Sequence, residues 1–402
     1  MKCVIFLGDG MADEPIAELS GKTPLEVANH PNMDMIASCG TMGIATSVPD
    51  GMSPGSDVAN LSLIGVDPKS CYTGRSPLEA VSIGVKLNDG DVTYRCNLVT
   101  LSDESEMSDK TMLDYSAGEI SSAEAAELIK CMQEKFGSDK VEFHAGVSYR
   151  HCLVLRGGNT GAQLTPPHDI SGKKVTGKLP QGQNSDLLLE MMAYSQKVFP
   201  EHPVNKKRVA EGKNPALSVW FWGEGTKPAL PDFKEKYGLD GAMISAVDLL
   251  HGIAISMGLK SIQVEGATGN FHTNFEGKGK AAVDALKNGS DFVYIHVEAP
   301  DECGHQGQLK EKIWSIEQID AKIIAPVMDY LKNCGDEWAV MVAPDHPTPM
   351  SVRTHTRTPI PFAYCSSKDE VKTKRRYCET EALKSGVVVD KADKLLGMML
   401  EK

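Results

Sequence analysis

The chain has 402 residues, of which 41% are hydrophobic and 24% charged, so it is long enough to bury one large core or two smaller ones. Its 54 acidic and 42 basic residues give a net charge of −12, which argues against the basic footprint that nucleic-acid binding requires. The ten cysteines form no C-x-x-C pair, and no apolar run reaches the roughly 18 residues of a membrane span, so we expect a cytoplasmic protein with reduced thiols and no membrane partner.

Three short apolar runs, at 4–7, 291–297 and 338–343, end at turns that carry charged side chains. Runs of this length that are rich in β-branched residues predict buried parallel strands. Apolar residues at helical spacing predict helices at 246–257 and 313–331, and the first of these leads into a further strand. Strands that alternate with helices indicate an α/β fold with a mainly parallel sheet flanked by helices.

The middle of the chain has a different pattern. Turn-rich pieces separate expected strands at 91–100 and 151–156, and a helix is expected at 122–135. This pattern predicts an α+β domain inserted into the first one. The expected division is a first domain of residues 1–70 and 228–402 and an inserted domain of residues 71–227.

Carboxylate and imidazole side chains follow the three predicted strands, and ligands bind beyond the carboxyl ends of strands in a parallel sheet. These two groups together suit divalent ions such as Zn and Mn, although a single D-x-x-x-H or Asp-His pattern is more often a turn than a site. Six ligands are too many for one tetrahedral ion and indicate two, which would clamp the attacking and leaving oxygens of a displacement at phosphorus. The six are Asp9, Asp301, His305, Asp345, His346 and His355.

Ser56 is the candidate nucleophile, because the segment around it predicts a loop that enters a helix. A helix N-terminus stabilises phosphate, and a metal-bound serine oxygen loses its proton near neutral pH. The simpler role for Ser56 is that of an N-cap, which is compatible with phosphate binding at the same position. The neighbouring Ser53 matches the G-x-S-x-G pattern of serine esterases, but Pro54 lacks the backbone N–H that this motif needs, which leaves an esterase as a minor alternative.

Nine motifs follow one another along the chain: GDG at 8–10, GKTPLE at 21–26, PGSDVA at 54–59, GRSPLEA at 74–80, YRCNL at 94–98, GVSYRH at 146–151, SAVDLL at 245–250, VEAPDE at 297–302 and PDH at 344–346. Together they resemble the 2,3-bisphosphoglycerate-independent phosphoglycerate mutases, specifically the archaeal-type group, within the alkaline phosphatase superfamily. The resemblance implies an alkaline-phosphatase-like domain interrupted by a substrate-handling domain. It also implies two divalent ions (Mn, Mg or Zn) and no requirement for 2,3-bisphosphoglycerate.

The resemblance further implies that Ser56 takes the phosphoryl group from 3-phosphoglycerate and returns it to the other hydroxyl of the bound glycerate, which gives 2-phosphoglycerate. One ion would be held by Asp9, Ser56, Asp345 and His346, and the other by Asp301, His305 and His355. The motifs of the inserted domain suggest Arg75, Arg95, Arg150 and His151 as anchors for the small phosphorylated substrate, although each is as readily a surface ion pair.

The chain departs from the longer bacterial mutases at two points. Asn60 stands where they have a histidine, and the active-site lysine that they carry after the strand near 263 is absent. Lys278 or Lys280 is the expected substitute. Four alternatives to the mutase remain: another phosphomutase, a metal-dependent phosphatase, a homoserine kinase, and a non-catalytic descendant of the enzyme. The other histidines, which are expected on the surface or in the core, are His30, His144, His168, His202, His251, His272 and His296.

Overall fold

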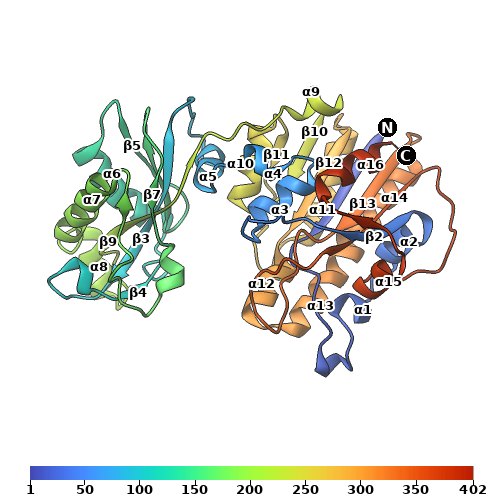
Figure 1. Cartoon of the computed structure of the whole chain (residues 1–402), viewed down its shortest axis with the longest axis horizontal. Coiled ribbons are helices and arrows are strands. Elements are labelled where there is room, and N and C mark those ends of the chain that lie inside the picture. The colour runs from blue at the N-terminus through green and yellow to red at the C-terminus, as the bar shows by residue number, and fades with distance from the viewer. Residues whose placement is uncertain (402) are drawn as a thin grey trace. The chain divides into compact units, whose positions relative to one another are not determined.

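The computed structural model describes residues 1–401, which divide into two compact units. The larger unit consists of residues 1–72 and 229–401, and the smaller unit consists of residues 73–228 (Figure 1). These limits lie one or two residues from the boundaries expected from the sequence. Within residues 1–401, every helix is too short or too polar to cross a membrane.

The larger unit is built on an eight-stranded sheet that is mostly parallel, as predicted. The first five strands in sheet order are parallel, and β14 runs antiparallel to both of its neighbours. In sheet order the strands are β11 (Lys260–Ile262), β10 (Gly241–Ile244), β12 (Phe292–Val297), β1 (Lys2–Gly8), β13 (Trp338–Ala343), β14 (Ile360–Ser366), β2 (Thr41–Ala45) and β15 (Val388–Val389).

Helices cover both faces of this sheet, which is why β1 and β12 are buried along nearly their whole length (Figure 1). Val4 and Phe6 of β1 face one helical layer, and the alternate residues face the other. The first layer contains α2 (Pro31–Cys39), α11 (Phe275–Lys287), α13 (Leu309–Gln318) and α14 (Ala325–Asn333); the second contains α3 (Ser56–Leu63), α10 (Asp248–Ser256) and α16 (Leu395–Leu400). The other α-helices of this unit are α1 (Pro24–Val27), α4 (Pro68–Cys71), α9 (Phe233–Tyr237), α12 (Ala299–Gln306) and α15 (Glu379–Lys384).

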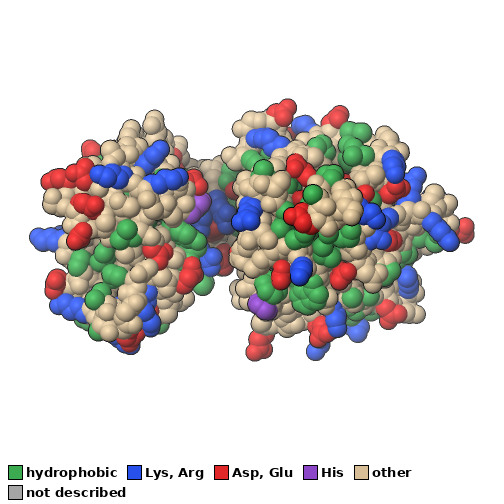
Figure 2. All heavy atoms as spheres, turned by 90° about the horizontal axis from the view of Figure 1, so that it is seen from below, with side chains coloured by type: hydrophobic (Ala, Val, Ile, Leu, Met, Phe, Trp, Pro, Cys, Tyr) green, Lys and Arg blue, Asp and Glu red, His purple; other side chains and the backbone are tan. Residues whose placement is uncertain are grey.

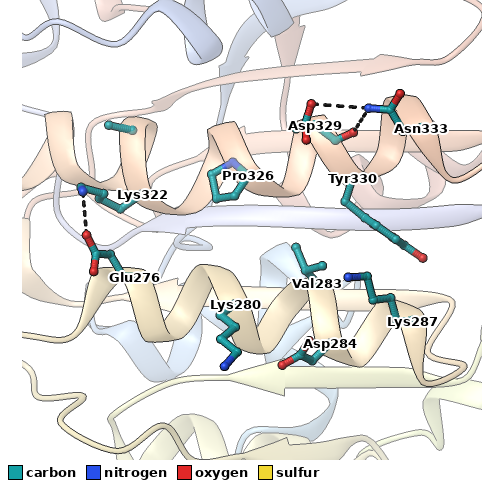
Figure 3. A pocket seen from close by; sticks show the side chains of 11 residues that line it. Glu276, Lys280, Val283, Asp284, Lys287, Lys322, Pro326, Asp329, Tyr330 and Asn333 are labelled. Carbon is teal, nitrogen blue, oxygen red and sulfur yellow. Dashed lines mark hydrogen bonds and ion pairs between the residues drawn. The ribbon is translucent and has the colours of Figure 1, made fainter.

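The helix predicted at 313–331 contains a wide turn that the sequence pattern did not indicate. A π-helical segment, Ile319–Ile324, joins α13 to α14. Pro326 follows it and has no N–H for a regular helical bond, which favours a local change of helix type. Gly279 of α11 packs here so closely that a Cβ atom would lie 2.3 Å from the carbonyl oxygen of Lys322. An open groove of about 680 Å³ runs between α11 and these segments (Figure 3).

The smaller unit is an antiparallel sheet with helices packed on it, which confirms the expected inserted α+β fold. Alternate residues of β3 contribute to the core under the helices, and Thr93, Arg95 and Asn97 face the other way. The strands are β3 (Val92–Leu101), β4 (Met112–Asp114), β5 (Val141–His144), β6 (Arg150–Leu155) and β9 (Ser218–Thr226), with a separate short pair, β7 (Ala162–Gln163) and β8 (Gln181–Gly182). The helices are α5 (Ser76–Ser82), α6 (Ser122–Phe136), α7 (Ser185–Val198) and α8 (Pro203–Ala210).

Charged side chains of both signs are intermingled on the molecular face shown in Figure 2. This distribution agrees with the excess of acidic over basic residues in the sequence. Among the described residues on that face, the lysines and arginines form no extended surface of the kind that follows a phosphate backbone.

Glu379, at the start of α15, is a half-buried carboxylate that ties α15 to the loop after β1. It accepts hydrogen bonds from the Thr23 hydroxyl at 2.6 Å and from the Asp13 N–H at 3.0 Å. Burial raises the pKa of Glu379 to about 7, because these bonds do not fully replace the water that a carboxylate loses. Glu379 is therefore an acidic group that the fold prefers to keep neutral.

We expect Glu379→Gln to stabilise the metal-loaded protein at pH 8 by about 1–2 kcal/mol and to have little effect at pH 5. The folded pKa of Glu379 exceeds its unfolded value, so its contribution to stability is present below pH 4.5 and is lost as the pH rises through about 7. Urea unfolding at the two pH values measures the difference. Glu381→Gln in the same helix is the control, and a Glu379→Gln protein that is less stable than wild type at pH 8 would contradict this account.

Candidate metal centre

The candidate ligands gather where three neighbouring strands end. β12, β1 and β13 are adjacent and parallel, so their carboxyl ends meet at one edge of the sheet. Asp9 directly follows β1, and Asp345 lies two residues after β13. Asp301 lies in the first turn of α12, which begins shortly after β12. Segments that are about 300 residues apart in the chain therefore bring their side chains together.

The first group of metal-type side chains contains Asp9, Asp345 and His346. One ligand atom from each lies within 4.8 Å of the others, and all three residues are at most 1% exposed. His346 Nε2 is 3.6 Å from Asp9 Oδ1 and 3.4 Å from Asp345 Oδ2. Ser56 Oγ lies 3.2 Å from the same nitrogen, so the candidate nucleophile belongs to this group.

The second group contains Asp301, His346 and His355, with the same close spacing of ligand atoms. His305 joins it, since its Nε2 lies 3.2 Å from Asp301 Oδ2 and 2.9 Å from His355 Nε2. The rings of His346 and His355 stack with 3.9 Å between centroids. His346 thus lies between the two groups, whereas the sequence assigned it to the first alone.

The tautomers of His305 and His355 are set by backbone carbonyls. His305 Nδ1 donates to the Arg353 carbonyl at 3.0 Å, and His355 Nδ1 donates to the Pro54 carbonyl at 2.7 Å. Each ring therefore turns Nε2 toward Asp301. In the metal-free protein these Nε2 atoms face Asp301, whose carboxylate raises the pKa of both rings. On deprotonation, a ring held by its Nδ1–H would present the Nε2 lone pair, which is the arrangement usual for a metal ligand.

Among the described residues, the Asp9 carboxylate pairs only with the imidazoles of His296 and His346, and burial lowers the pKa of both rings. Burial raises the pKa of Asp9 well above its ordinary value, and the charges of Asp345 and Asp301 add to this. Asp9 Oδ1 is buried without a hydrogen-bond partner. Asp301 behaves oppositely: burial opposes ionisation, but hydrogen bonds from His305 and His355 hold its pKa well below the ordinary value. A set of carboxylate oxygens and imidazole nitrogens with an unpartnered buried oxygen fits divalent cations.

Ser56 is the first residue of α3, and Gly55 is the N-cap, so Ser56 does not have the N-cap role that the sequence allowed. Asn60, one turn later, donates to the Ser56 carbonyl at 2.8 Å and to Asp345 Oδ2 at 2.9 Å. Tyr294 of β12 donates its hydroxyl to Asn60 Oδ1 at 2.7 Å. Asn60 therefore connects the start of α3 to a carboxylate of the cluster.

His296 belongs to the cluster, although no motif in the sequence pointed to it. It is a fully buried residue of β12, as expected for a core histidine, but one of its partners is Asp9, at 2.9 Å between Nε2 and Oδ2. Burial lowers the pKa of His296 to about 3, which keeps the ring neutral. Its only signal in the sequence is a polar residue within an otherwise apolar strand, a few residues before Asp301.

Three of the candidate substrate residues lie together in the smaller unit, around Glu79. Its carboxylate accepts a hydrogen bond from Arg75 Nε at 2.6 Å and forms an ion pair with Arg95, at 2.7 Å from Nε. Burial opposes ionisation of Glu79, but the charges of Arg95, Arg75 and Arg150 hold its pKa below the ordinary value. Burial lowers the pKa of Arg95 to about 10, and the guanidinium lies 4.0 Å from the Trp222 ring centroid. Three guanidinium groups around one carboxylate leave an excess of positive charge that suits an anion.

His151 and Lys278 do not join the arginines. His151 pairs with Cys96 on the side of the sheet that faces the helices, whereas Arg150 points to the other side. The Nδ1 atom of His151 accepts a bond from the Gly146 N–H at 3.1 Å. Lys278, in the larger unit, is fully buried and donates to the His296 carbonyl at 3.0 Å, and burial lowers its pKa to about 8. Lys280 lines the groove of Figure 3.

Comparisons with known proteins identify the family of the chain. Residues 37–205 match the family model for 2,3-bisphosphoglycerate-independent phosphoglycerate mutase. A relative from Geobacter sulfurreducens, named a probable 2,3-bisphosphoglycerate-independent phosphoglycerate mutase, is 49% identical over 100% of both chains. A Methanosarcina mazei relative with that family name is 48% identical, again over 100% of both chains.

Solved structures show the same fold. The PH0037 protein from Pyrococcus horikoshii is 29% identical with a TM-score of 0.82, covering 100% of this chain and 96% of that one. The cofactor-independent phosphoglycerate mutase from Thermoplasma acidophilum is 23% identical with a TM-score of 0.65, covering 100% and 99%. A serine beside two groups of candidate metal ligands, at the edge of a parallel sheet, is the arrangement that metal-dependent phosphoryl transfer requires. The chain belongs to the 2,3-bisphosphoglycerate-independent phosphoglycerate mutase family, whose members are isomerases.

Proposed function

We propose that this chain interconverts 3-phosphoglycerate and 2-phosphoglycerate in the cytoplasm through a phosphoserine at Ser56, without 2,3-bisphosphoglycerate. One observation carries the proposal: Ser56 Oγ lies 3.2 Å from His346 Nε2, inside a cluster of buried metal-type ligands. The full-length likeness to relatives that are named as these mutases supports the choice of substrate.

The proposed site would hold two divalent ions, Mn, Mg or Zn. Asp9, Ser56, Asp345 and His346 would hold one, and Asp301, His305 and His355 the other; the proximity of His346 to both groups also lets it contact the second. Bound there, the ions would neutralise charge at phosphorus and lower the pKa of the serine hydroxyl.

The residues of the chain itself supply the nucleophile and its orientation. Ser56 Oγ attacks phosphorus, and the N-terminus of the eight-residue helix α3 directs backbone N–H groups toward the phosphoryl oxygens. Asn60 fixes Ser56 relative to Asp345 through its two hydrogen bonds. The phosphoryl group then passes from Ser56 to the other hydroxyl of the retained glycerate, so each P–O bond that breaks is replaced by a new one.

The arginine cluster of the smaller unit is proposed to bind the anionic groups of the substrate. We expect Arg150→Ala to raise KM by about 10–100-fold, because a hydrogen bond to a charged group contributes about 1.5–3 kcal/mol. Arg150 is exposed, so the melting temperature should hardly change. Steady-state kinetics measure the effect, with Arg156→Ala as the control: Arg156 pairs with Glu142 and Asp91 at the other end of β6. An unchanged KM in Arg150→Ala would remove this residue from the substrate site.

Phosphorus NMR of the Mn-loaded protein with 3-phosphoglycerate tests the function directly. If the chain is a mutase, we expect the spectrum to show 2-phosphoglycerate without added bisphosphoglycerate and with little inorganic phosphate. A phosphatase would release inorganic phosphate without isomerisation, and that result would contradict the proposal. An esterase at Ser53 would keep its activity in a chelator, whereas the mutase would lose it.

A further inference from the structure

A row of three polar side chains crosses the sheet edge behind the metal centre. β10, β12 and β1 are neighbours in the sheet, with Ile244 opposite Ile295 and Leu7 opposite His296. Ser245 directly follows β10 and Asp9 directly follows β1, so both lie beside His296. The distances are 3.1 Å from Ser245 Oγ to His296 Nδ1 and 2.9 Å from His296 Nε2 to Asp9 Oδ2.

The protons of this row have one consistent order when Asp9 is ionised. A carboxylate only accepts hydrogen bonds, so Nε2 of His296 must carry the hydrogen. Nδ1 of the neutral ring then has a lone pair and accepts from the Ser245 hydroxyl. That hydroxyl accepts in turn from the Val247 N–H, which lies 3.0 Å away. Every donor in the row has an acceptor. Each hydrogen bond is donated toward Asp9, starting from the loop after β10.

The two oxygens of Asp9 therefore differ. Oδ2 is held by His296, whereas Oδ1 is buried without a hydrogen-bond partner and lies 3.6 Å from His346 Nε2. The backbone of His296 is itself fixed, because buried Lys278 donates to its carbonyl at 3.0 Å. A partial rotation of the Asp9 carboxylate would break the bond from His296 and turn Oδ1 away from His346.

We propose that His296 is a positioning residue, which holds Asp9 so that Oδ1 alone faces the first metal position, and that Ser245 sets the tautomer that His296 needs. This inference rests on the proposed function, because it concerns the ion held by Asp9, Asp345 and His346. His296 touches neither substrate nor ion; it acts through Asp9. Groups that orient a metal ligand in this way typically change metal affinity by about 10–100-fold.

Three variants separate the hydrogen bond from the packing of the ring. His296→Leu removes the donor, whereas His296→Gln retains an N–H near the position of Nε2. His30→Leu is the matched control, since His30 is also buried and paired with a carboxylate, that of Asp34 at 3.0 Å, outside the cluster and outside this row. Ser245→Ala removes only the hydroxyl and keeps the inference testable if His296→Leu does not fold.

Mn²⁺ titration of the metal-free proteins, followed by the electron paramagnetic resonance of free Mn²⁺, is the test. We expect two sites in wild type and in His30→Leu, one site weakened about 10–100-fold in His296→Leu, and near-wild-type affinity in His296→Gln. Equal weakening in the Gln and Leu variants, or wild-type affinity in His296→Leu, would overturn the inference. A wild-type chain that binds no Mn²⁺ would overturn the proposed function together with it.

Nitrogen-15 NMR of the histidine rings in the Mg²⁺-loaded protein, where Asp9 is ionised, supplies a readout that packing alone would not move. Wild type should show His296 as a single Nε2–H tautomer, and Ser245→Ala should show a mixture together with weaker Mn²⁺ binding at one site. An unaltered tautomer and unaltered Mn²⁺ binding in Ser245→Ala would overturn the role assigned to Ser245. A wild-type ring that carries its hydrogen on Nδ1 would overturn the whole order of the row.

Discussion

Ser56→Ala is expected to lower the mutase kcat by about four orders of magnitude or more, because no other group can take its place as nucleophile. Ser56 Oγ is the hydroxyl that lies 3.2 Å from His346 at the start of α3. Gly55, and not Ser56, is the N-cap, so the substitution removes no capping bond. The stability of the variant should therefore stay within about 0.5 kcal/mol of wild type, as for an ordinary surface substitution.

The measurement combines kinetics with mass spectrometry of acid-quenched protein. Wild type incubated with 3-phosphoglycerate and Mn²⁺ should carry a phosphate on the peptide that contains Ser56, and the alanine variant should carry none. Ser53→Ala is the matched control: Ser53 is exposed, three residues away, and belongs to the G-x-S-x-G pattern. Full activity in Ser56→Ala, or a comparable loss in Ser53→Ala, would show that the nucleophile has been assigned to the wrong serine.

The sheet and the edge of the site were predictable because the sequence encodes them locally. The apolar runs that became β1, β12 and β13 are continuous, as is required of strands covered on both faces. The polar residues that follow them must then lie at the carboxyl edge of a parallel sheet. This geometric rule is why four of the six candidate ligands could be named before their distances were known, and the local patterns around them suggested His305 and His355.

The partners of these ligands could not be predicted, because they depend on strand order and on which face a side chain occupies. His296 meets Asp9 only because β12 lies beside β1. His151 follows Arg150 directly in the chain, yet the alternation of a strand sends the two side chains to opposite faces. The π-helical segment after α13 was missed for a similar reason: the apolar spacing of 313–331 continues through it without a break.

Removal of divalent ions is expected to reverse the order of stability between wild type and Asp9→Asn. In the metal-free protein, burial and the charges of Asp345 and Asp301 raise the pKa of Asp9 well above its ordinary value. Ionised Asp9 therefore destabilises the metal-free fold at pH 8, and asparagine removes this cost. With ions bound, each site adds about 2.7 kcal/mol at a hundredfold excess over Kd, and wild type gains more than the variant, which has lost a charged ligand.

Thermal unfolding with chelator and with Mn²⁺ measures both states. We expect Mn²⁺ to raise the melting temperature of wild type by about 5–10 °C and that of Asp9→Asn by clearly less. In chelator the variant should melt higher at pH 8, and the difference should shrink toward pH 5. The sign follows from a raised folded pKa: the stability that Asp9 contributes is present below its ordinary pKa and is lost as the pH rises through the raised value.

A buried carboxylate outside the cluster separates this effect from the general cost of burying charge. Asp320 is 1% exposed, and burial raises its pKa although it accepts bonds from Asn32 and the Met33 N–H. Asp320→Asn should shift the melting temperature by the same amount with and without Mn²⁺, whereas the shift caused by Asp9→Asn should change its sign. A contrary result would be that each variant shifts the melting temperature by the same amount with Mn²⁺ as with chelator. The repulsion at Asp9 would then not be relieved by metal, and the first metal position would lie elsewhere.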